Sequence, residues 1–319
     1  MAERSPRLCY AFDERSAPLG GASSPVPPRT LTRRDAVLAA IALLAPQTAE
    51  AASPYEVREI VVAGDGKFPR RFTLVVPRHT TQPVPLVVLF HGKGESVDER
   101  LGVHAWTERY GLTSAYERLL QAPVTAGDTR STYWKPERLR EVNESLVSRP
   151  FGGLAIACPF TPDVFRIGGR EKFLDGYAAW ITDELIPRAR RETPILEGHQ
   201  HVGVDGVSLG GYVSIEVFLR RAEHFGAWGS VQGALGGYQA KRYAEALAAT
   251  LSRVGARRLH VETSLADVYR DDNELLAKRL RELGVAHDFS APPGAHNQPF
   301  LRDSGTLEML LWHDRALRG

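Results

Sequence analysis

One stretch of this 319-residue chain, residues 201–212, constrains the fold more than any other. It begins as an apolar run, turns at glycines and continues with helical spacing. Gly206, Ser208 and Gly210 match the pattern G-x-S-x-G, in which a serine occupies a strained strand-to-helix turn and glycines let the two elements approach closely. Ser208 would then lie at a helix N-terminus, where free N–H groups stabilise negative charge. A glycine-rich turn with a capping serine would give the same pattern, so the rest of the chain has to decide.

Apolar runs of strand length alternate with helical segments along the chain. This alternation is typical of an α/β fold with a mostly parallel sheet and helices on both faces. Two shorter runs at 57–63 and 71–76, joined by the turn signal Gly64–Lys67, predict an antiparallel hairpin before the core strands. The predicted core strands are 85–90, 151–159, the run before Ser208, 228–235, 258–263 and 285–289, and the predicted helices are 105–120, 137–146, 173–190, the segment after Ser208, 238–251, 274–283 and 301–317.

The bulk composition is that of an ordinary globular protein, with 43% hydrophobic residues and a formal net charge of +2. Because no long run of like charge occurs, the sequence argues against a nucleic-acid-binding surface. Its two cysteines are Cys9 and Cys158. Cys158 lies in an apolar run, and we expect it to be an inert buried thiol.

The N-terminal region has the pattern of an export signal. Residues 1–31 are rich in Pro, Ser and Arg and predict disorder. Arg33-Arg34, a short apolar stretch and Ala49-Glu50-Ala51 then follow the order of a twin-arginine-type signal peptide, with cleavage expected after Ala51. The alternative is a surface helix of the mature protein. The signal predicts a periplasmic or secreted protein, without a stable membrane anchor, whose residues 52–319 form one catalytic domain with no internal disulfide.

A serine hydroxyl is a weak nucleophile and needs a base that is itself held by a carboxylate. On an elbow-type sheet the chain order is Ser, then Asp or Glu, then His. His296 lies in the Pro- and Gly-rich loop 292–299, which leaves the last predicted strand at the same sheet edge as Ser208, and we predict it as the base. Four other histidines follow Ser208 but are expected near a helix end, within strands or on the surface of the last helix: His224, His260, His287 and His313.

The orienting carboxylate is expected in the loop after the strand 258–263. Asp267 comes first after that strand, where a turn would face the site, and we predict it as the acid. Asp271 and Asp272 look like caps of the next helix and remain the alternatives.

Two further regions bear on the site. The loop His91–Gly94 follows a predicted buried strand, where backbone N–H groups can point into an oxyanion hole, although a plain glycine turn would look the same. Residues 95–150 form a long excursion that is either part of a cap over a cleft or packing around the core. The expected substrate contacts are His91, Gly92, Trp134 and Tyr212. His199-Gln200-His201 lies just before the elbow strand with no carboxylate pattern of a metal site nearby, so we predict no metal site.

With these elements located, the chain resembles the α/β-hydrolase superfamily. It is similar to the esterase group that includes esterase D-like enzymes, feruloyl esterases and polyhydroxybutyrate depolymerase-like proteins. The resemblance covers roughly residues 57–317, and the closing helix is also similar. Asn297-Gln298-Pro299 departs from the aromatic residue that often follows this loop in the group. The matching residues are His91-Gly92, Gly206-Val207-Ser208-Leu209-Gly210-Gly211, Asp267 and Pro293-Gly294-Ala295-His296.

The resemblance implies hydrolysis of carboxylic esters through an acyl-enzyme. Ser208 would attack the carbonyl, His296 would take and return the proton, and Asp267 would hold the imidazole. The N–H groups of Leu209 and Lys93 would bind the oxyanion, and no cofactor would be needed. A polyester depolymerase, a peptidase or an acyltransferase on the same fold are alternatives, and a non-catalytic binding protein of this fold is the alternative from a different class.

Overall fold

The computed structural model describes residues 53–63, 70–127 and 133–319. The predicted disordered leader, the signal sequence and its cleavage after Ala51 lie outside these residues. Within them, one sheet has the strand order β1-β2-β4-β3-β5-β6-β7-β8. The strands are β1 (Tyr55–Val61), β2 (Arg71–Pro77), β3 (Leu86–Phe90), β4 (Ala155–Pro159), β5 (Val202–Gly206), β6 (Ala227–Val231), β7 (Arg258–Glu262) and β8 (Asp288–Ser290).

The sheet is parallel except at one end. β1 and β2 pair antiparallel, which confirms the predicted hairpin, and β2 is also antiparallel to β4. From β4 through β3, β5, β6 and β7 to β8 every pairing is parallel. The carboxyl ends of these strands therefore meet at one edge, where Phe90 of β3 pairs with Gly206 of β5. Active sites of such sheets lie at this edge.

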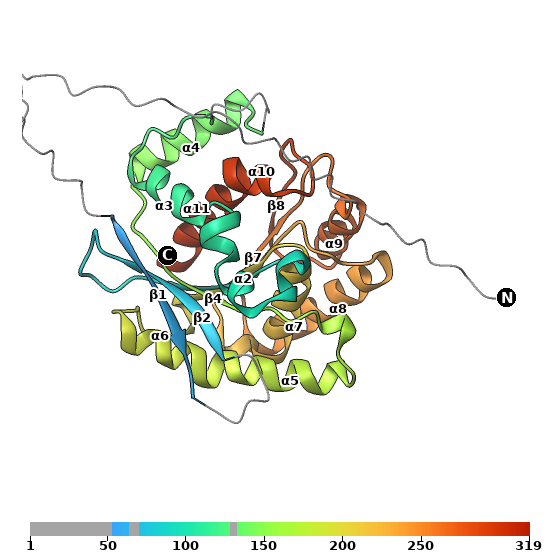
Figure 1. Cartoon of the computed structure of the whole chain (residues 1–319). Coiled ribbons are helices and arrows are strands. Elements are labelled where there is room, and N and C mark those ends of the chain that lie inside the picture. Colours follow the sequence, from blue (N-terminus) through green and yellow to red (C-terminus); the bar gives the residue numbers. More distant parts are fainter. Residues whose placement is uncertain (1–52, 64–69, 128–132) are drawn as a thin grey trace, which may run out of the picture. The chain divides into compact units, whose positions relative to one another are not determined.

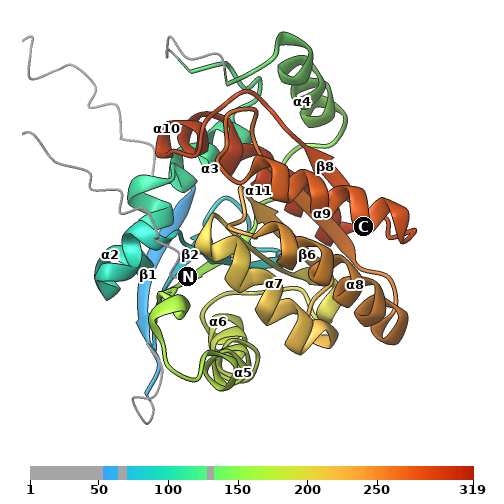
Figure 2. The same ribbon diagram turned by 90° about the vertical axis from the view of Figure 1, so that its right-hand side faces the viewer.

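Two layers of helices cover the sheet, as Figures 1 and 2 show. Side chains alternate across a strand. Leu86, Val88 and Phe90 of β3 accordingly pack in the core beneath α5 to α9, whereas Val87 and Leu89 pack in a second core beneath α3 and α11. The helices are α2 (Glu99–Val103), α3 (Leu112–Leu120), α4 (Pro136–Ser148), α5 (Arg170–Trp180), α6 (Ile186–Glu192), α7 (Leu209–Arg221), α8 (Gly237–Val254), α9 (Arg270–Glu282), α10 (Gln298–Phe300) and α11 (Thr306–Arg318).

Shorter helical turns fill the connections. They are η1 (Lys93–Val97), η2 (Ala105–Arg109), η3 (Val164–Arg166), η4 (Ile181–Leu185), η5 (His199–His201), η6 (Ala222–His224) and η7 (Leu301–Gly305). The single helix predicted over 105–120 is wrong, because Gly111 separates η2 from α3 with a φ of 74°. A Cβ on Gly111 would lie 2.8 Å from the Cα of Arg302, so the chain turns there at a residue that only glycine fits.

Two predictions about burial have opposite outcomes. Cys158 is fully buried in β4, which confirms its predicted position, and burial raises the pKa of its thiol. The expected surface position of His313 is wrong, because α11 packs this side chain, fully buried, against Asp205 of β5. None of the helices in the described parts of the chain is both long and apolar enough to cross a membrane.

Candidate active site

The turn between β5 and α7 places Ser208 at the carboxyl edge of the sheet. Ser208 has a φ of 58° and a ψ of −116°, a backbone conformation that costs free energy for any residue other than glycine. The flanking positions explain the glycines. A Cβ on Gly206 would lie 2.4 Å from the backbone of Gly210, and a Cβ on Gly210 would lie 2.1 Å from the carbonyl oxygen of Phe90. The structure therefore has the strained elbow that the motif predicts.

Ser208, His296 and Asp267 form one hydrogen-bonded chain. The Nε2 of His296 lies 2.9 Å from the Oγ of Ser208, and its Nδ1 lies 2.8 Å from Oδ1 of Asp267. The Asp267 side chain is buried and also accepts hydrogen bonds from the Thr263 hydroxyl at 2.7 Å and the Tyr269 N–H at 3.0 Å. With Nδ1–H donated to the carboxylate, Nε2 is free to accept the serine proton.

The two loops that supply the acid and the base run side by side. Ala266 and Ala295 form a parallel bridge, and the N–H of Ala266 donates to the carbonyl of Gly294 at 2.8 Å. The structure thus places Asp267 against the imidazole. Asp271 and Asp272, the alternatives from the sequence, lie in the first turn of α9.

Gln232 connects these loops and was not expected from the sequence. It ends the β6 edge with a φ of 49°, again unusual for a residue other than glycine, and its side chain is buried. Its Nε2 donates to the Ser264 hydroxyl at 2.7 Å and to the Ala295 carbonyl at 3.0 Å. The amide group of Gln232 therefore adds a side-chain connection to the backbone contacts that already join the loop of Asp267 to the loop of His296.

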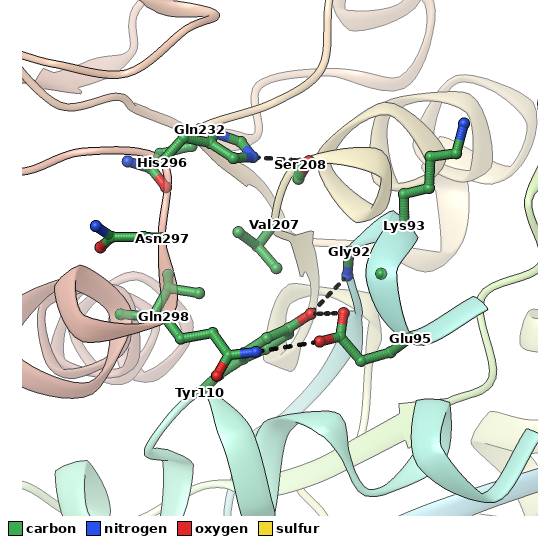
Figure 3. A pocket seen from close by; sticks show the side chains of 12 residues that line it. Gly92, Lys93, Glu95, Tyr110, Val207, Ser208, Gln232, His296, Asn297 and Gln298 are labelled. Carbon is green, nitrogen blue, oxygen red and sulfur yellow. Dashed lines mark hydrogen bonds between the residues drawn. The ribbon is translucent and has the colours of Figure 1, made fainter. Parts of the chain in front are cut away.

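The expected oxyanion donors, the backbone N–H groups of Leu209 and Lys93, each begin a helical segment. Lys93 lines the pocket beside Ser208, and Leu209 follows Ser208 in the chain without being part of the lining. Leu209 is the first residue of α7 and Lys93 the first of η1, and the first N–H groups of a helix have no acceptor within it. The N–H of Gly92 instead donates to the Tyr110 hydroxyl at 3.2 Å. The Lys93 ammonium lies 3.4 Å from the Asp163 carboxylate, and its side chain points away from the pocket in Figure 3, so only its backbone faces the site.

A pocket of about 220 Å³ opens beside Ser208. Figure 3 shows Ser208 and His296 at one end and Glu95, Tyr110 and Gln298 at the other. The sequence interpretation did not single out these three, which come from three different segments. The excursion 95–150 thus contributes to the pocket through Glu95 and Tyr110. The complete lining is Gly92, Lys93, Gly94, Glu95, Tyr110, Val207, Ser208, Gln232, His296, Asn297, Gln298 and Leu301.

Of the expected substrate contacts, Gly92 lines the pocket and His91 does not. His91 is fully buried and ties the end of β3 to the segment after β4: its Nε2 lies 2.8 Å from the Thr161 N–H, and its backbone N–H donates to the Thr161 hydroxyl at 3.0 Å. Burial lowers the pKa of His91 to about 4, so a neutral imidazole accepts the Thr161 N–H. His91 therefore supports the loop after β3 through contacts outside the pocket.

Trp134 and Tyr212 also lie outside the pocket lining, contrary to expectation. The Trp134 indole N–H donates to the carbonyl of Asp303 at 3.2 Å, and the side chain belongs to the core beneath α11. Tyr212 is buried on α7, with its ring centroid 4.8 Å from that of Phe165. Both aromatic rings pack against other side chains in the interior, Trp134 beneath α11 and Tyr212 on α7, and do not contact the pocket.

A second carboxylate–histidine pair lies beneath α11, next to the end of β5 that leads into the elbow. Asp205 is fully buried, accepts the N–H of Gly206 at 2.6 Å and lies 2.9 Å from Nε2 of His313. Burial opposes ionisation of Asp205, but His260 and His313 beside it lower the pKa of the carboxyl below its ordinary value. Burial also lowers the pKa of His313, so a neutral imidazole donates to a carboxylate next to the strand end that carries Ser208.

Comparison with known proteins supports the fold. No protein-family model and no curated protein sequence matches this chain. Among solved structures, a ferulic acid esterase is similar with a TM-score of 0.60 and 15% identity over 82% of this chain and 99% of that one. A feruloyl esterase module from Clostridium thermocellum, complexed with sinapinate, has a TM-score of 0.57 and 11% identity over 81% and 88%. S-formylglutathione hydrolase from Staphylococcus aureus has a TM-score of 0.53 and 14% identity over 82% and 97%. The chain has the α/β-hydrolase fold.

Proposed function

We propose that this protein is a serine hydrolase that cleaves carboxylic esters through an acyl-enzyme. The observation that carries the proposal is the position of His296, whose ring contacts both the Ser208 hydroxyl and the Asp267 carboxylate. Nucleophile, base and orienting acid are recognised by this geometry rather than by their order in the sequence. Three proteins of the same fold are esterases or hydrolases by name, which supports the same class of reaction.

The residues divide the reaction into two steps. His296 takes the Ser208 proton as the oxygen attacks the ester carbonyl, and Asp267 stabilises the imidazolium that forms. The N–H groups of Leu209 and Lys93 bind the tetrahedral oxyanion. His296 then protonates the leaving alcohol, and in the second step it activates the water that releases the acid. In both steps every protein group that takes part belongs to this chain.

Turnover of simple esters tests the proposal. The purified protein is expected to release p-nitrophenol from short-chain p-nitrophenyl esters and to give the free acid as product. A folded protein that leaves every ester of a varied panel intact would contradict the proposal and would favour a binding function. Transfer of the acyl group to an added alcohol in place of water would favour the acyltransferase alternative.

Gln232 provides a test of how the site is held together. We expect Gln232→Ala and Gln232→Gly both to lower kcat by about 10-fold to 100-fold with little change in KM, because a small displacement of base or acid has effects of this size. Glycine relieves the backbone strain whereas alanine keeps it. Full activity of the glycine variant would therefore show that strain, and not the two side-chain hydrogen bonds, is what matters at this position.

Export is part of the proposal, because residues 1–51 have the order of a twin-arginine signal. In a bacterial host with that pathway, we expect the full chain to reach the periplasm and to have an intact mass that begins at Ala52. Replacing Arg33 and Arg34 together by lysine should retain the protein in the cytoplasm, whereas Arg29→Lys, outside the pair, should not. Export of the double variant would argue against this signal type.

A further inference from the structure

The pocket beside Ser208 has a second polar end. Glu95 lies in η1, and its side chain is only 6% exposed. Together with Tyr110 and Gln298 it forms the end of the pocket opposite Ser208 and His296 (Figure 3). The proposed ester hydrolysis does not require a carboxylate at this place. A buried carboxylate is costly unless hydrogen-bond donors surround it, so its partners indicate what it is there to bind.

One oxygen of Glu95 is fully engaged. The Tyr110 hydroxyl donates to Oε2 and accepts the N–H of Gly92. Burial, together with the neighbouring Glu95, raises the pKa of Tyr110 well above its ordinary value, so Tyr110 remains a neutral donor. This oxygen is therefore committed to the protein and fixes the direction in which the carboxylate points.

Among the residues that the structure describes, the other oxygen has only distant partners. Oε1 lies 3.4 Å from the Gln298 amide nitrogen and 3.8 Å from the Arg109 guanidinium. Charged nitrogen donors normally lie about 2.7–2.9 Å from a carboxylate oxygen. Both contacts of Oε1 are longer than this, so the oxygen can accept a hydrogen bond from a closer donor. Gln298 is itself held in place, because its Oε1 accepts from Arg302 at 2.9 Å. Glu95 Oε1 is therefore an acceptor that the pocket offers to a bound molecule.

Charge at this end selects the kind of donor. Arg109 lies beside Glu95 and Arg302 beside Gln298. The two guanidinium groups offset the carboxylate, so a cationic group would gain little attraction there, while an anionic group would face Glu95. A neutral hydroxyl suits this environment, because it donates one hydrogen bond without adding charge. The rest of the lining includes the small or apolar residues Gly92, Gly94, Val207 and Leu301.

We infer that Glu95 is a specificity-determining residue and that the preferred substrates are esters with a hydroxyl on the group that enters this pocket. The inference rests on the proposed ester hydrolysis. Ser208 engages the ester carbonyl at one end of the pocket while Glu95 Oε1 accepts the substrate hydroxyl at the other. The hydroxyl belongs either to the acyl group or to the alcohol, and both have the same chemistry.

Pairs of esters that differ by OH against CH₃ test this. The acyl pair is p-nitrophenyl 3-hydroxybutanoate and 3-methylbutanoate, and the alcohol pair is 2-hydroxyethyl acetate and propyl acetate. We expect kcat/KM to favour the hydroxyl member of one pair by about 10-fold to 100-fold, the effect of a hydrogen bond to a charged group. A cationic analogue of the alcohol, 2-(dimethylammonio)ethyl acetate, should not share this advantage.

The variant Glu95→Gln separates recognition of the substrate hydroxyl from the structural role of Glu95 in holding Tyr110. Its oxygen can still accept from Tyr110, which turns the amide NH₂ toward the pocket and replaces the acceptor by a donor. The hydroxyl preference should then fall by about 10-fold or more. Glu99→Gln, the same change at an exposed position of α2, should keep the wild-type ratio.

The possible outcomes distinguish failure of hydroxyl recognition by Glu95 from failure of the proposed ester hydrolysis. If Glu95 only braces Tyr110, Glu95→Gln will slow both members of a pair equally, and the unchanged ratio will refute substrate recognition. Equal turnover of the two members in both pairs by the wild-type protein would also refute substrate recognition and leave the proposed esterase function standing. Absence of turnover for every ester would refute the proposed function and this inference together.

Discussion

Replacing Ser208 by alanine is expected to lower kcat/KM for esters by about 10⁴-fold to 10⁶-fold, because removal of a triad nucleophile has an effect of this size. The fold should persist, since alanine keeps the Cβ and the elbow is held by glycines and backbone contacts. Steady-state kinetics on p-nitrophenyl esters measure the effect. Ser252→Ala, the same change on the exposed side of α8, should leave the rate unchanged.

The double variant Ser208→Ala/His296→Ala makes this test sharper. The two residues act as one unit through the 2.9 Å contact between Nε2 and Oγ. Losing both should therefore reduce the rate little further than losing Ser208 alone. Two large losses that multiply would mean that His296 works independently of Ser208, and the proposed mechanism would be wrong in that step.

Gly210→Ala is expected to destabilise the folded protein by about 3 kcal/mol or more, the upper range of overpacking effects. The added Cβ would lie 2.1 Å from the carbonyl oxygen and 2.5 Å from the carbonyl carbon of Phe90. These are backbone atoms of the central strand β3, so no side-chain rotation removes the clash. The expected result is a lower midpoint in urea unfolding, or loss of soluble protein, accompanied by loss of activity.

Gly236→Ala is the matched control. Gly236 has a φ of −79° and a ψ of 149°, which alanine adopts without strain, and no atom lies within 4 Å of the added Cβ. Gly236 is the N-cap of α8, where alanine is less favourable than glycine, but alanine also narrows the unfolded ensemble. We therefore expect the substitution to change the free energy of unfolding by no more than about 1 kcal/mol. If Gly210→Ala unfolds at the same urea concentration as this control, the close approach of α7 to β3 is not what requires a glycine there.

Elements whose structure depends on residues close together in the sequence could be predicted. The elbow, the parallel sheet with its hairpin and the loop position of His296 follow from apolar runs and glycines within short windows. The structure brings Asp267 to His296 because consecutive parallel strands end at one edge, which the order of strands already implied.

Features that depend on distant partners could not be predicted. His313 was expected at the surface because nothing near it in the sequence shows that Asp205 lies beneath α11. Gln232 was placed inside a strand predicted over 228–235, because apolar content alone does not mark where the chain turns at a positive φ. The available signals were a polar side chain in the middle of that run and the glycine that follows it, Gly233.

The polar end of the pocket shows the same limit. Glu95 belongs to η1, Tyr110 to the turn before α3 and Gln298 to the start of α10, and their hydrogen bonds join positions up to 203 residues apart. Single-sequence patterns do not report such pairs. Trp134 and Tyr212 were expected at the pocket because aromatic residues often line clefts, but packing decided their positions.

Reaction with a fluorophosphonate, followed by intact mass, tests the central claim most directly, because the reagent modifies only a serine that a base has activated. We expect one covalent adduct on the wild-type protein and none on folded Ser208→Ala. No adduct on the folded wild-type protein, or an adduct that persists without Ser208, would contradict the assignment of Ser208, His296 and Asp267 as the catalytic residues.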